Sequence, residues 1–260
     1  MTATRPPAAD TSVGRALRVV DVVAEMGDGA TPKAIARRLG FTLPTTYRLL
    51  TMLVEEGYLV RLREPRGYGL GYRMGALARR LADQVAAPWS VQAVLHDMHE
   101  AAGAASYYAV IRGGDVVVAH LDACPDHPGD GAPRVGEPAP AHALAAGKVL
   151  LAWLDRRRLA DVLATPLPAF TPGTVTDRAM LDRELRRCRE LGSAVEVEEL
   201  RPDRAGMASP VRGPGGAVVG AVALSVSRVE LMARWSELER VVRDGAARAG
   251  AGLSRPVAVG

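Results

Sequence analysis

The sequence lacks any apolar run long enough to cross a membrane. Its longest nearly unbroken run, Ala217–Val226, spans about ten residues, and a membrane helix needs roughly twenty. The chain begins MTATRPPAAD, so prolines and an aspartate stand where a signal peptide would carry its apolar stretch. These absences predict a cytoplasmic protein without a membrane partner.

Cysteine is also scarce, since Cys124 and Cys188 are the only two. Two cysteines without C-x-x-C spacing do not indicate a disulfide scaffold, and we expect both to be free thiols. The 260 residues are 48% apolar and 24% charged, which is ordinary for a folded chain and excludes disordered, collagen-like and coiled-coil classes. The length suits one large domain or two ordinary ones.

Catalytic motifs are missing as well. The chain has no G-x-S-x-G motif, and Gly147-Lys148 does not belong to a phosphate-binding loop. That loop would need glycine in place of His142 and serine or threonine in place of Val149. We therefore expect no enzyme activity, no cofactor and no bound metal.

One polar cluster keeps an alternative open, a metal-dependent small-molecule enzyme whose basic domain serves oligomerisation. Imidazole, carboxylate and thiol side chains of this kind can hold a divalent metal. The members are His120, Asp122, Cys124, Asp126 and His127, with His96 or His99 as further ligands.

The positive charge is concentrated near the N-terminus. Residues 1–85 contain 13 Lys and Arg against 8 Asp and Glu, or +5, whereas the remaining residues contain 20 against 21, or −1. A basic first third beside a neutral remainder is typical of a nucleic-acid-binding module joined to another domain.

Hydrophobic spacing predicts three helices in this first third. The segment Thr11–Met26 places Val13, Leu17, Val20 and Val23 on one stripe, as expected for an amphipathic helix. A short helix follows Thr31, the predicted N-cap, and buries Ile35, Ala36 and Leu39. The third helix starts after Pro44 and ends at Gly57.

A short helix, a turn and a polar-starting helix are typical of a helix-turn-helix, whose second helix enters the DNA major groove. The apolar spacing of Tyr47, Leu50, Leu53 and Val54 leaves open whether Tyr47 lies in the core or contacts bases. The polar and basic side chains predicted to contact DNA are Thr31, Lys33, Thr42, Thr45, Thr46, Tyr47 and Arg48.

Two short strands around a turn at Glu64–Gly67 predict a wing. It carries Arg61, Arg63 and Arg66, which can contact the phosphates that flank the recognition site. Behind it, Met74–Val85 predicts an amphipathic linker helix, and its apolar stripe favours dimerisation.

The remaining residues alternate irregularly between predicted helices and strands, which favours an α+β fold. A helix over 91–102 precedes a hairpin of strands 106–111 and 116–121, and the Pro/Gly-rich stretch 123–141 is expected to be a loop. Three helices, three strands and a last helix follow. Their expected ranges are 143–154, 156–163, 179–191, 194–197, 206–211, 217–226 and 229–249.

Over about residues 12–250 the sequence resembles the isocitrate-lyase-regulator (IclR) family of bacterial transcription factors. The first domain carries YRLL at 47–50 and LVEEGY at 53–58, and the second carries PAHA at 140–143 and AGKVLLA at 146–152. Further matches follow in the family's order: Phe170-Thr171-Pro172, Thr174, Thr176, Leu185, Arg189, Gly192, Ala194, Glu198-Glu199, Ala208 and Pro210-Val211.

The resemblance implies a disordered tail at 1–10, a winged helix-turn-helix domain at 11–73, a linker helix at 74–88 and an effector domain at 89–255. The last is expected to be GAF-like, with a mostly antiparallel sheet, and to bind a small acidic metabolite. The family also forms dimers that often pair into tetramers. Its ligand positions correspond to Ala145, Ala146, Glu196, Gly206, Ser225 and Ser227.

Two of these expectations have a physical basis of their own. Backbone N–H groups at a helix start, as at Ala145 and Ala146, attract a carboxylate. Ser225 and Ser227 are two apart on a strand and should share a face, although either could be an ordinary hydrogen-bonded strand serine. The chain departs from the family at Gly206, where cysteine is frequent, and at Asp203, where glycine is.

We therefore expect a DNA-binding transcriptional regulator, a repressor rather than an activator, whose operator affinity is controlled by a small metabolite. Its partners would be an operator in double-stranded DNA, the effector and a second copy of the chain. Besides the metal-dependent enzyme, a constitutive DNA-organising protein without a ligand remains an alternative.

Overall fold

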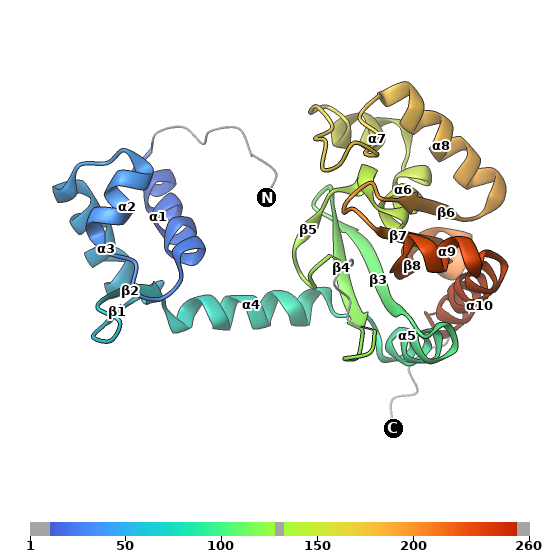
Figure 1. Cartoon of the computed structure of the whole chain (residues 1–260), viewed down its shortest axis with the longest axis horizontal. Coiled ribbons are helices and arrows are strands. Elements are labelled where there is room, and N and C mark those ends of the chain that lie inside the picture. The colour runs from blue at the N-terminus through green and yellow to red at the C-terminus, as the bar shows by residue number, and fades with distance from the viewer. Residues whose placement is uncertain (1–10, 128–132, 254–260) are drawn as a thin grey trace. The chain divides into compact units, whose positions relative to one another are not determined.

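The computed structural model describes residues 11–127 and 133–253, so the tail expected at 1–10 lies outside the described residues. The chain divides into two compact units, the first ending at Asp83 and the second beginning at Gln84 (Figure 1). This division falls within the segment predicted to link two domains. Helices and an antiparallel sheet occur together, which confirms the α+β class.

The first unit is a winged helix-turn-helix. Its N-capping residues Thr11, Thr31 and Thr42 each accept a hydrogen bond from a backbone N–H three residues on, which fixes where the helices start. The hairpin pairs its two strands antiparallel. The elements are α1 (Ser12–Met26), α2 (Pro32–Leu39), α3 (Leu43–Glu55), β1 (Leu59–Leu62), β2 (Gly67–Leu70) and α4 (Tyr72–Val85).

The predicted apolar stripe of α1 has to be corrected at two positions. Val13 and Leu17 are 70% and 56% exposed, while Val19, Val20 and Val23 are buried in the core with α2 and α3. The helix has apolar residues on more than one side, and packing against α3 selects the side that includes Val19. Spacing along a single helix cannot make that selection.

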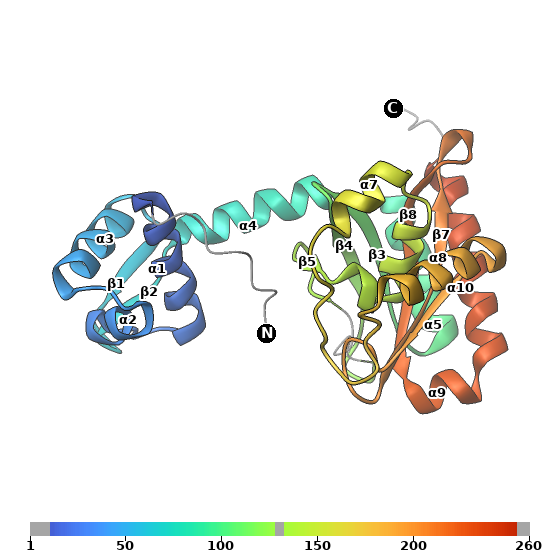
Figure 2. The same cartoon turned by 90° about the horizontal axis from the view of Figure 1, so that it is seen from above.

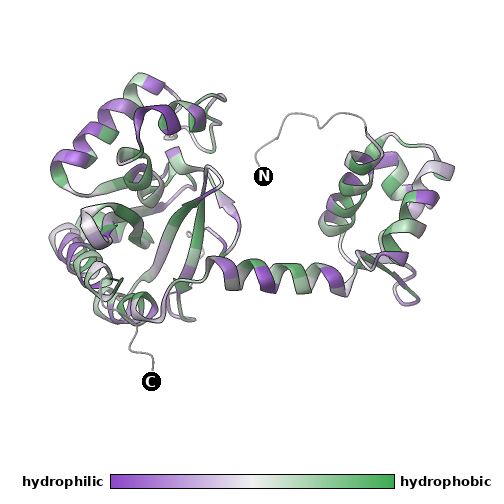
Figure 3. Ribbon diagram, turned by 180° about the vertical axis from the view of Figure 1, so that it is seen from behind, coloured by the Kyte–Doolittle hydropathy of each residue, from purple (hydrophilic) through white to green (hydrophobic). Residues whose placement is uncertain are grey.

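Helix α4 begins earlier than predicted. Its apolar stripe is left uncovered in part, since Leu77 and Leu81 are 43% and 40% exposed. Figure 3 shows hydrophobic and hydrophilic bands alternating along this helix. Dimerisation through α4 remains a prediction.

The second unit is built on a six-stranded sheet with the order β5-β4-β3-β8-β7-β6, and all of its neighbouring strands are antiparallel. The short strand β5 lies in the segment predicted to be a loop, where Pro138 and Ala139 pair with β4. The strands are β3 (Ala105–Arg112), β4 (Asp115–Asp122), β5 (Pro138–Ala139), β6 (Ala194–Val197), β7 (Arg204–Arg212) and β8 (Val218–Ser227).

Helices cover both faces of this sheet (Figure 2). One face packs against α5 (Trp89–Ala102), α9 (Arg228–Ala233) and α10 (Trp235–Leu253). The other packs against α6 (Ala145–Ala152), α7 (Arg156–Val162) and α8 (Arg178–Leu191). No helix in the described part of the chain is long and apolar enough to cross a membrane.

Two predicted helices differ from the structure. The last helix is divided in two at Arg234, whose guanidinium donates 2.7 Å hydrogen bonds to the carbonyl of Ala102 and to Glu237. The helix expected at 143–154 begins at Ala145, because residues 141–143 form a 3₁₀ turn.

Candidate DNA-binding surface and effector site

The exposed side of α3 is a stripe of residues at helical spacing. Pro44, Tyr47, Arg48 and Thr51 are all exposed, and Tyr47 is 53% exposed, so it does not belong to the core. Arg48 forms no ion pair with any described residue. Sequence reasoning missed Pro44 and Thr51, although their three- and four-residue steps from Tyr47 and Arg48 place them on the same side.

The threonines predicted to contact DNA have different environments. Thr31 and Thr42 are exposed caps, and Thr45 is half-buried and accepts a hydrogen bond from the Thr42 hydroxyl. Thr46 is fully buried, and its hydroxyl donates to the carbonyl of Thr42 at 3.0 Å. The DNA contact predicted for Thr46 is therefore corrected, because its side chain faces the core.

The wing presents uncompensated positive charge. Arg61, Arg63 and Arg66 are exposed, and none of them forms an ion pair within the described residues. By contrast, Arg38 and Arg73 are paired with Glu25 and Glu56. Lys33 near the start of α2 is exposed too, so it is available to phosphates together with Arg48 and the three wing arginines.

The base of the wing is anchored to the turn between α1 and α2. Ala30 and Tyr68 exchange two backbone hydrogen bonds of 3.1 and 2.9 Å. A Cβ atom at Gly67 would overlap the backbone of Gly29, so only glycine allows this approach. The wing is thus held in place before DNA arrives.

In the second unit, two neighbouring rows of mostly small residues cross four strands, on the sheet face that α6 covers. Strand register places the residues of each row side by side, and side chains two apart on a strand share a face. The first row is Ala105, Ser225, Gly206 and Glu196, and the second is Tyr107, Ala223, Ala208 and Ala194.

The start of α6 meets the first row at Gly206. A Cβ atom added there would lie 3.3 Å from Glu196 Oε1 and 3.6 Å from the Cβ of Ala145. Ala145 and Ala146 are fully buried in the first turn, where backbone N–H groups have no partner within the helix. Five of the six residues carried over from the family therefore converge here.

Tyr107 is a residue of this site that sequence reasoning missed. It is 2% exposed, and its pKa is raised first by burial and then by the negative charge of Glu196, which places its hydroxyl near that carboxylate. Among described residues, neither the Tyr107 hydroxyl nor the Ser225 hydroxyl forms a hydrogen bond. Neither oxygen is among the fully buried polar atoms that lack a partner, so both are available to a ligand.

Glu196 is the buried carboxyl group of the site. It is 6% exposed, and its Oε2 accepts a 3.2 Å hydrogen bond from the backbone N–H of Glu199. Burial raises the pKa of Glu196 to about 7, and the charge of Glu199 adds to this, while hydrogen bonds and Lys148 oppose it.

A buried lysine lies beside Glu196. Lys148 on α6 is 1% exposed, and its Nζ contacts Glu199 Oε1 at 2.5 Å and Glu184 Oε2 on α8 at 2.6 Å. Burial raises the pKa of Glu199 although Lys148 opposes the shift. Sequence reasoning noted Lys148 in a failed phosphate-loop motif and in the AGKVLLA family match, but predicted no role for it.

The loop that carries Glu199 is held by the FTP-x-T segment. The Thr174 hydroxyl donates to the carbonyl of Glu199 at 2.6 Å, and the Thr171 hydroxyl donates to that of Glu198 at 2.5 Å. Asp203, at the far end of this loop, has a φ of 59°, a left-handed conformation that explains the family's preference for glycine there.

Ser227 has a different environment from Ser225. Its hydroxyl donates to Glu230 Oε2 at 2.6 Å and accepts from the Glu230 N–H at 3.1 Å, which forms a capping box for α9. Because this hydroxyl is already occupied, we assign Ser227 to the helix cap rather than to a ligand.

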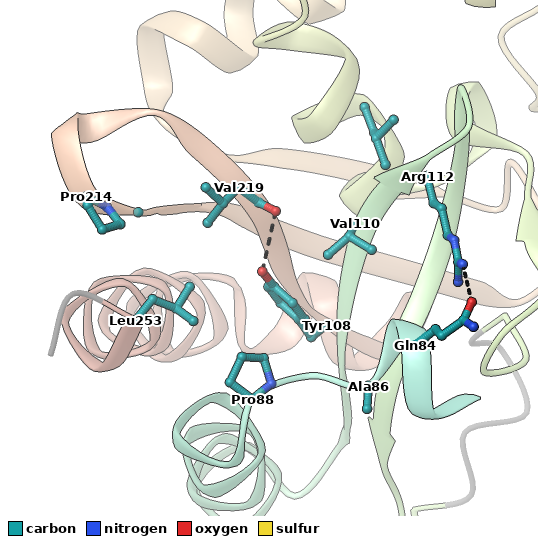
Figure 4. Close-up of a pocket in the computed structure, with 11 residues that line it drawn as sticks. Gln84, Ala86, Pro88, Tyr108, Val110, Arg112, Pro214, Val219 and Leu253 are labelled. Atoms are coloured by element: carbon teal, nitrogen blue, oxygen red, sulfur yellow. Dashed lines mark hydrogen bonds between the residues drawn. The ribbon is translucent and has the colours of Figure 1, made fainter. Parts of the chain in front are cut away.

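A depression on the second unit lies elsewhere, among the start of α5, strand β3, the β7–β8 hairpin and the end of α10 (Figure 4). It has a volume of about 570 Å³, and Tyr108, Val110, Val219 and Leu253 give it apolar walls. Arg112, the one charged residue lining it, donates to Gln84 at 2.7 Å. None of the six residues carried over from the family lines this depression.

The polar cluster near His120 is not assembled as a metal site. His96 Nδ1 lies 3.4 Å from Asp122, and the rings of His99 and His127 meet edge to face at 5.8 Å. Across residues 11–127 and 133–253, no group of three or more His, Cys, Asp or Glu is placed to hold a metal ion.

Known families match both units. The IclR helix-turn-helix domain matches residues 12–63, and the bacterial transcriptional regulator IclR C-terminal domain matches residues 88–249. The chain belongs to the IclR family. It is a DNA-binding transcriptional regulator with an effector-binding domain, and the enzyme alternative is not supported.

Individual IclR relatives match along nearly the whole chain. The transcriptional regulator Rv1719 of Mycobacterium tuberculosis is 31% identical and covers 87% of this chain and 86% of its own length. The repressor AllR of Salmonella typhi is 28% identical, with 94% and 91% covered. A Microbacterium hydrocarbonoxydans IclR homologue, solved with 4-hydroxybenzoate, is 24% identical with a TM-score of 0.70, covering 94% and 99%.

The raised pKa of Glu196 makes the stability of the second unit depend on pH. Because the folded pKa of about 7 exceeds the ordinary 4.5, the folded state binds the proton more tightly than the unfolded state does. Stability is therefore expected to fall as the pH rises from about 4.5 to 7, by about 3 kcal/mol. Glu196→Gln should remove this fall and be the more stable form at about pH 8.

Denaturant unfolding at several pH values measures this effect, and Glu190→Gln on the exposed side of α8 is the matched control. Wild-type protein and Glu190→Gln should lose stability in parallel as the pH rises. An equal pH dependence in Glu196→Gln would show that Glu196 does not titrate in this range.

Proposed function

We propose that the protein is a metabolite-controlled repressor that binds operator DNA as a dimer, in the cytoplasm, through the α3 stripe and the wing. The DNA-binding part of this proposal rests on one observation, the set of exposed, unpaired cations around α3. These cations are Arg48, the three wing arginines and Lys33. A dimer would place two such surfaces on half-sites one helical turn or a multiple apart. The partly exposed stripe of α4 supports a dimer, and AllR supports repression.

We place the effector over the row of Ser225 and Gly206, between Tyr107 and Glu196 and against the start of α6. Support comes from the hydroxyls of Tyr107 and Ser225, which form no hydrogen bond with a described residue, and from the helix N–H groups, which favour a carboxylate. The homologue that was solved with 4-hydroxybenzoate, a small carboxylic acid, supports a small acid as the effector. Effector binding would change operator affinity through a coupling of about 1–3 kcal/mol, or roughly 5- to 150-fold.

Genome-wide mapping of the DNA bound by the protein tests this proposal. It should return a small number of sites with paired half-sites, and the neighbouring genes would indicate which acids to test as effectors. Each acid would then be examined for operator release and for stabilisation of the protein against heat. Binding spread evenly along the chromosome would instead favour a DNA-organising protein.

Arg48→Ala is expected to weaken operator binding by about 1–3 kcal/mol if the guanidinium contacts a base, since one good base contact has that value. If it contacts a phosphate, the salt slope should become shallower by about 0.9 for each subunit. Fluorescence anisotropy at several salt concentrations separates the two cases. Arg240→Ala on α10 removes the same charge from an exposed position of the second unit and should bind normally. Unchanged affinity in Arg48→Ala would exclude docking through this side of α3.

A further inference from the structure

The candidate effector site contains more buried negative charge than positive charge. The carboxyls of Glu196 and Glu199 are 6% exposed each, and Lys148, at 1%, is the cation that both of them face. Tyr107 faces Glu196 from β3 and carries no charge at neutral pH, since its pKa is raised. The site already has one carboxylate in excess before a ligand arrives.

The other charged groups nearby do not compensate this excess. Lys148 also contacts Glu184, so its charge is shared by two carboxylates within 2.6 Å. His142, on the turn before α6, donates from Nε2 to the Pro168 carbonyl at 3.0 Å, and burial lowers its pKa, which disfavours its charged form. Arg204 precedes Gly206 by two positions on β7, and its charge acts on Glu230.

A ligand carboxylate placed against the start of α6 would meet Glu196 directly. Glu196 Oε1 and the Cβ of Ala145, at the start of α6, both lie close to Gly206, within 3.3 and 3.6 Å of where a Cβ atom would stand. Two ionised carboxylates in contact in a buried site repel strongly, whereas a protonated carboxyl can donate a hydrogen bond to a carboxylate. The repulsion and the hydrogen bond both favour the protonated form of Glu196 once the ligand is bound.

We propose that a carboxylate ligand enters this site together with one proton, and that Glu196 holds this proton and donates it in a hydrogen bond to the ligand. The proton comes from solvent and forms an O–H bond on Glu196, so no other group changes its protonation state. This inference rests on the proposed effector site. It makes the regulator sensitive to pH as well as to its metabolite, with tighter effector binding in more acidic conditions.

Acetate is a suitable probe, because it is smaller than any other carboxylate effector except formate and stays ionised from pH 6 to 8. Acetamide has nearly the same shape but no charge. Saturation-transfer NMR on the full chain would give the affinity of each probe at about pH 6 and about pH 8. With a pKa of about 7, the protonated fraction of Glu196 falls about tenfold between these values, and acetate affinity should fall with it.

Glu196→Gln is the deciding variant. The glutamine amide can still accept from the Glu199 N–H through its oxygen and donate to the ligand through its nitrogen, but it does not titrate. We expect this variant to bind acetate with nearly equal affinity at both pH values. Wild-type protein should likewise bind acetamide with nearly equal affinity at both pH values. Glu190→Gln, which changes an exposed carboxylate, should keep the tenfold dependence.

The outcomes separate this inference from the proposed function. Acetate binding that is independent of pH in wild-type protein, or that falls equally in Glu196→Gln, overturns the proton uptake and leaves the effector site standing. No acetate binding at either pH overturns the carboxylate site itself, and the inference with it. If Glu196→Gln does not fold, wild-type protein still provides the test. Proton uptake predicts that acetate affinity depends on pH and that acetamide affinity does not, and an equal pH dependence for the two probes overturns it.

Discussion

Replacing Arg61, Arg63 and Arg66 with alanine together is expected to weaken DNA binding by roughly a thousandfold or more at low salt, because hydrogen bonds to charged groups contribute about 1.5–3 kcal/mol each. The salt dependence should change as well. Each neutralised phosphate adds about 0.9 to the slope of log K against log salt, so three lost contacts make it shallower by about 2.7 for each subunit. Anisotropy titrations at four or five salt concentrations measure both effects.

Helix α7 offers a matched control for this variant. Arg156, Arg157 and Arg158 are three consecutive exposed arginines in the second unit, so replacing them with alanine removes the same net charge. This control should leave the slope unchanged if the wing contacts DNA directly. Equal changes in the two triple variants would mean that only the overall charge of the protein matters, and the wing assignment would then be wrong.

The effect of the wing variant on folding should be small. All three arginines are exposed and unpaired, and surface substitutions of this kind usually change stability by less than about 0.5 kcal/mol. The contacts that hold the wing are backbone hydrogen bonds between Ala30 and Tyr68, which the substitutions do not touch. Loss of DNA binding could therefore not be ascribed to loss of the wing.

Sequence patterns predicted the elements of this fold better than they predicted which residues are buried. The cap Thr31 is a local signal, and the structure confirms the helix start that it marks. The buried side of α1 and the burial of Thr46 depend on how helices pack against each other. That information lies in contacts between distant segments, and a single helix does not contain it.

In the candidate effector site, too, sequence patterns predicted some residues and missed those that depend on contacts between distant segments. Ser225, Gly206 and Glu196 could be carried over from the family pattern, and strand register places them side by side. Tyr107 lies on a strand about a hundred positions earlier and reaches the site only because β3 pairs with β8. Ser227 has the same spacing signal as Ser225, yet it caps α9, because strand β8 ends there.

The chain contains only two lysines, and they allow a sharp test of the buried charges. Lys148→Met is expected to destabilise the second unit by about 3–5 kcal/mol, because it leaves Glu199 buried without its cation. Methionine has a similar length, so little of this loss would come from an empty cavity. Lys33→Met makes the same substitution at an exposed position and should leave stability nearly unchanged.

Tryptophan fluorescence is the appropriate measurement, because all three tryptophans, Trp89, Trp153 and Trp235, belong to the second unit. The loss should also depend on pH. Without Lys148 the pKa of Glu199 rises further, so the folded state of the variant takes up a proton more readily than the unfolded state does. Lowering the pH toward about 5 should then recover part of the lost stability. A loss of less than about 1 kcal/mol, unchanged with pH, would mean that the buried carboxyls are neutral without help from Lys148.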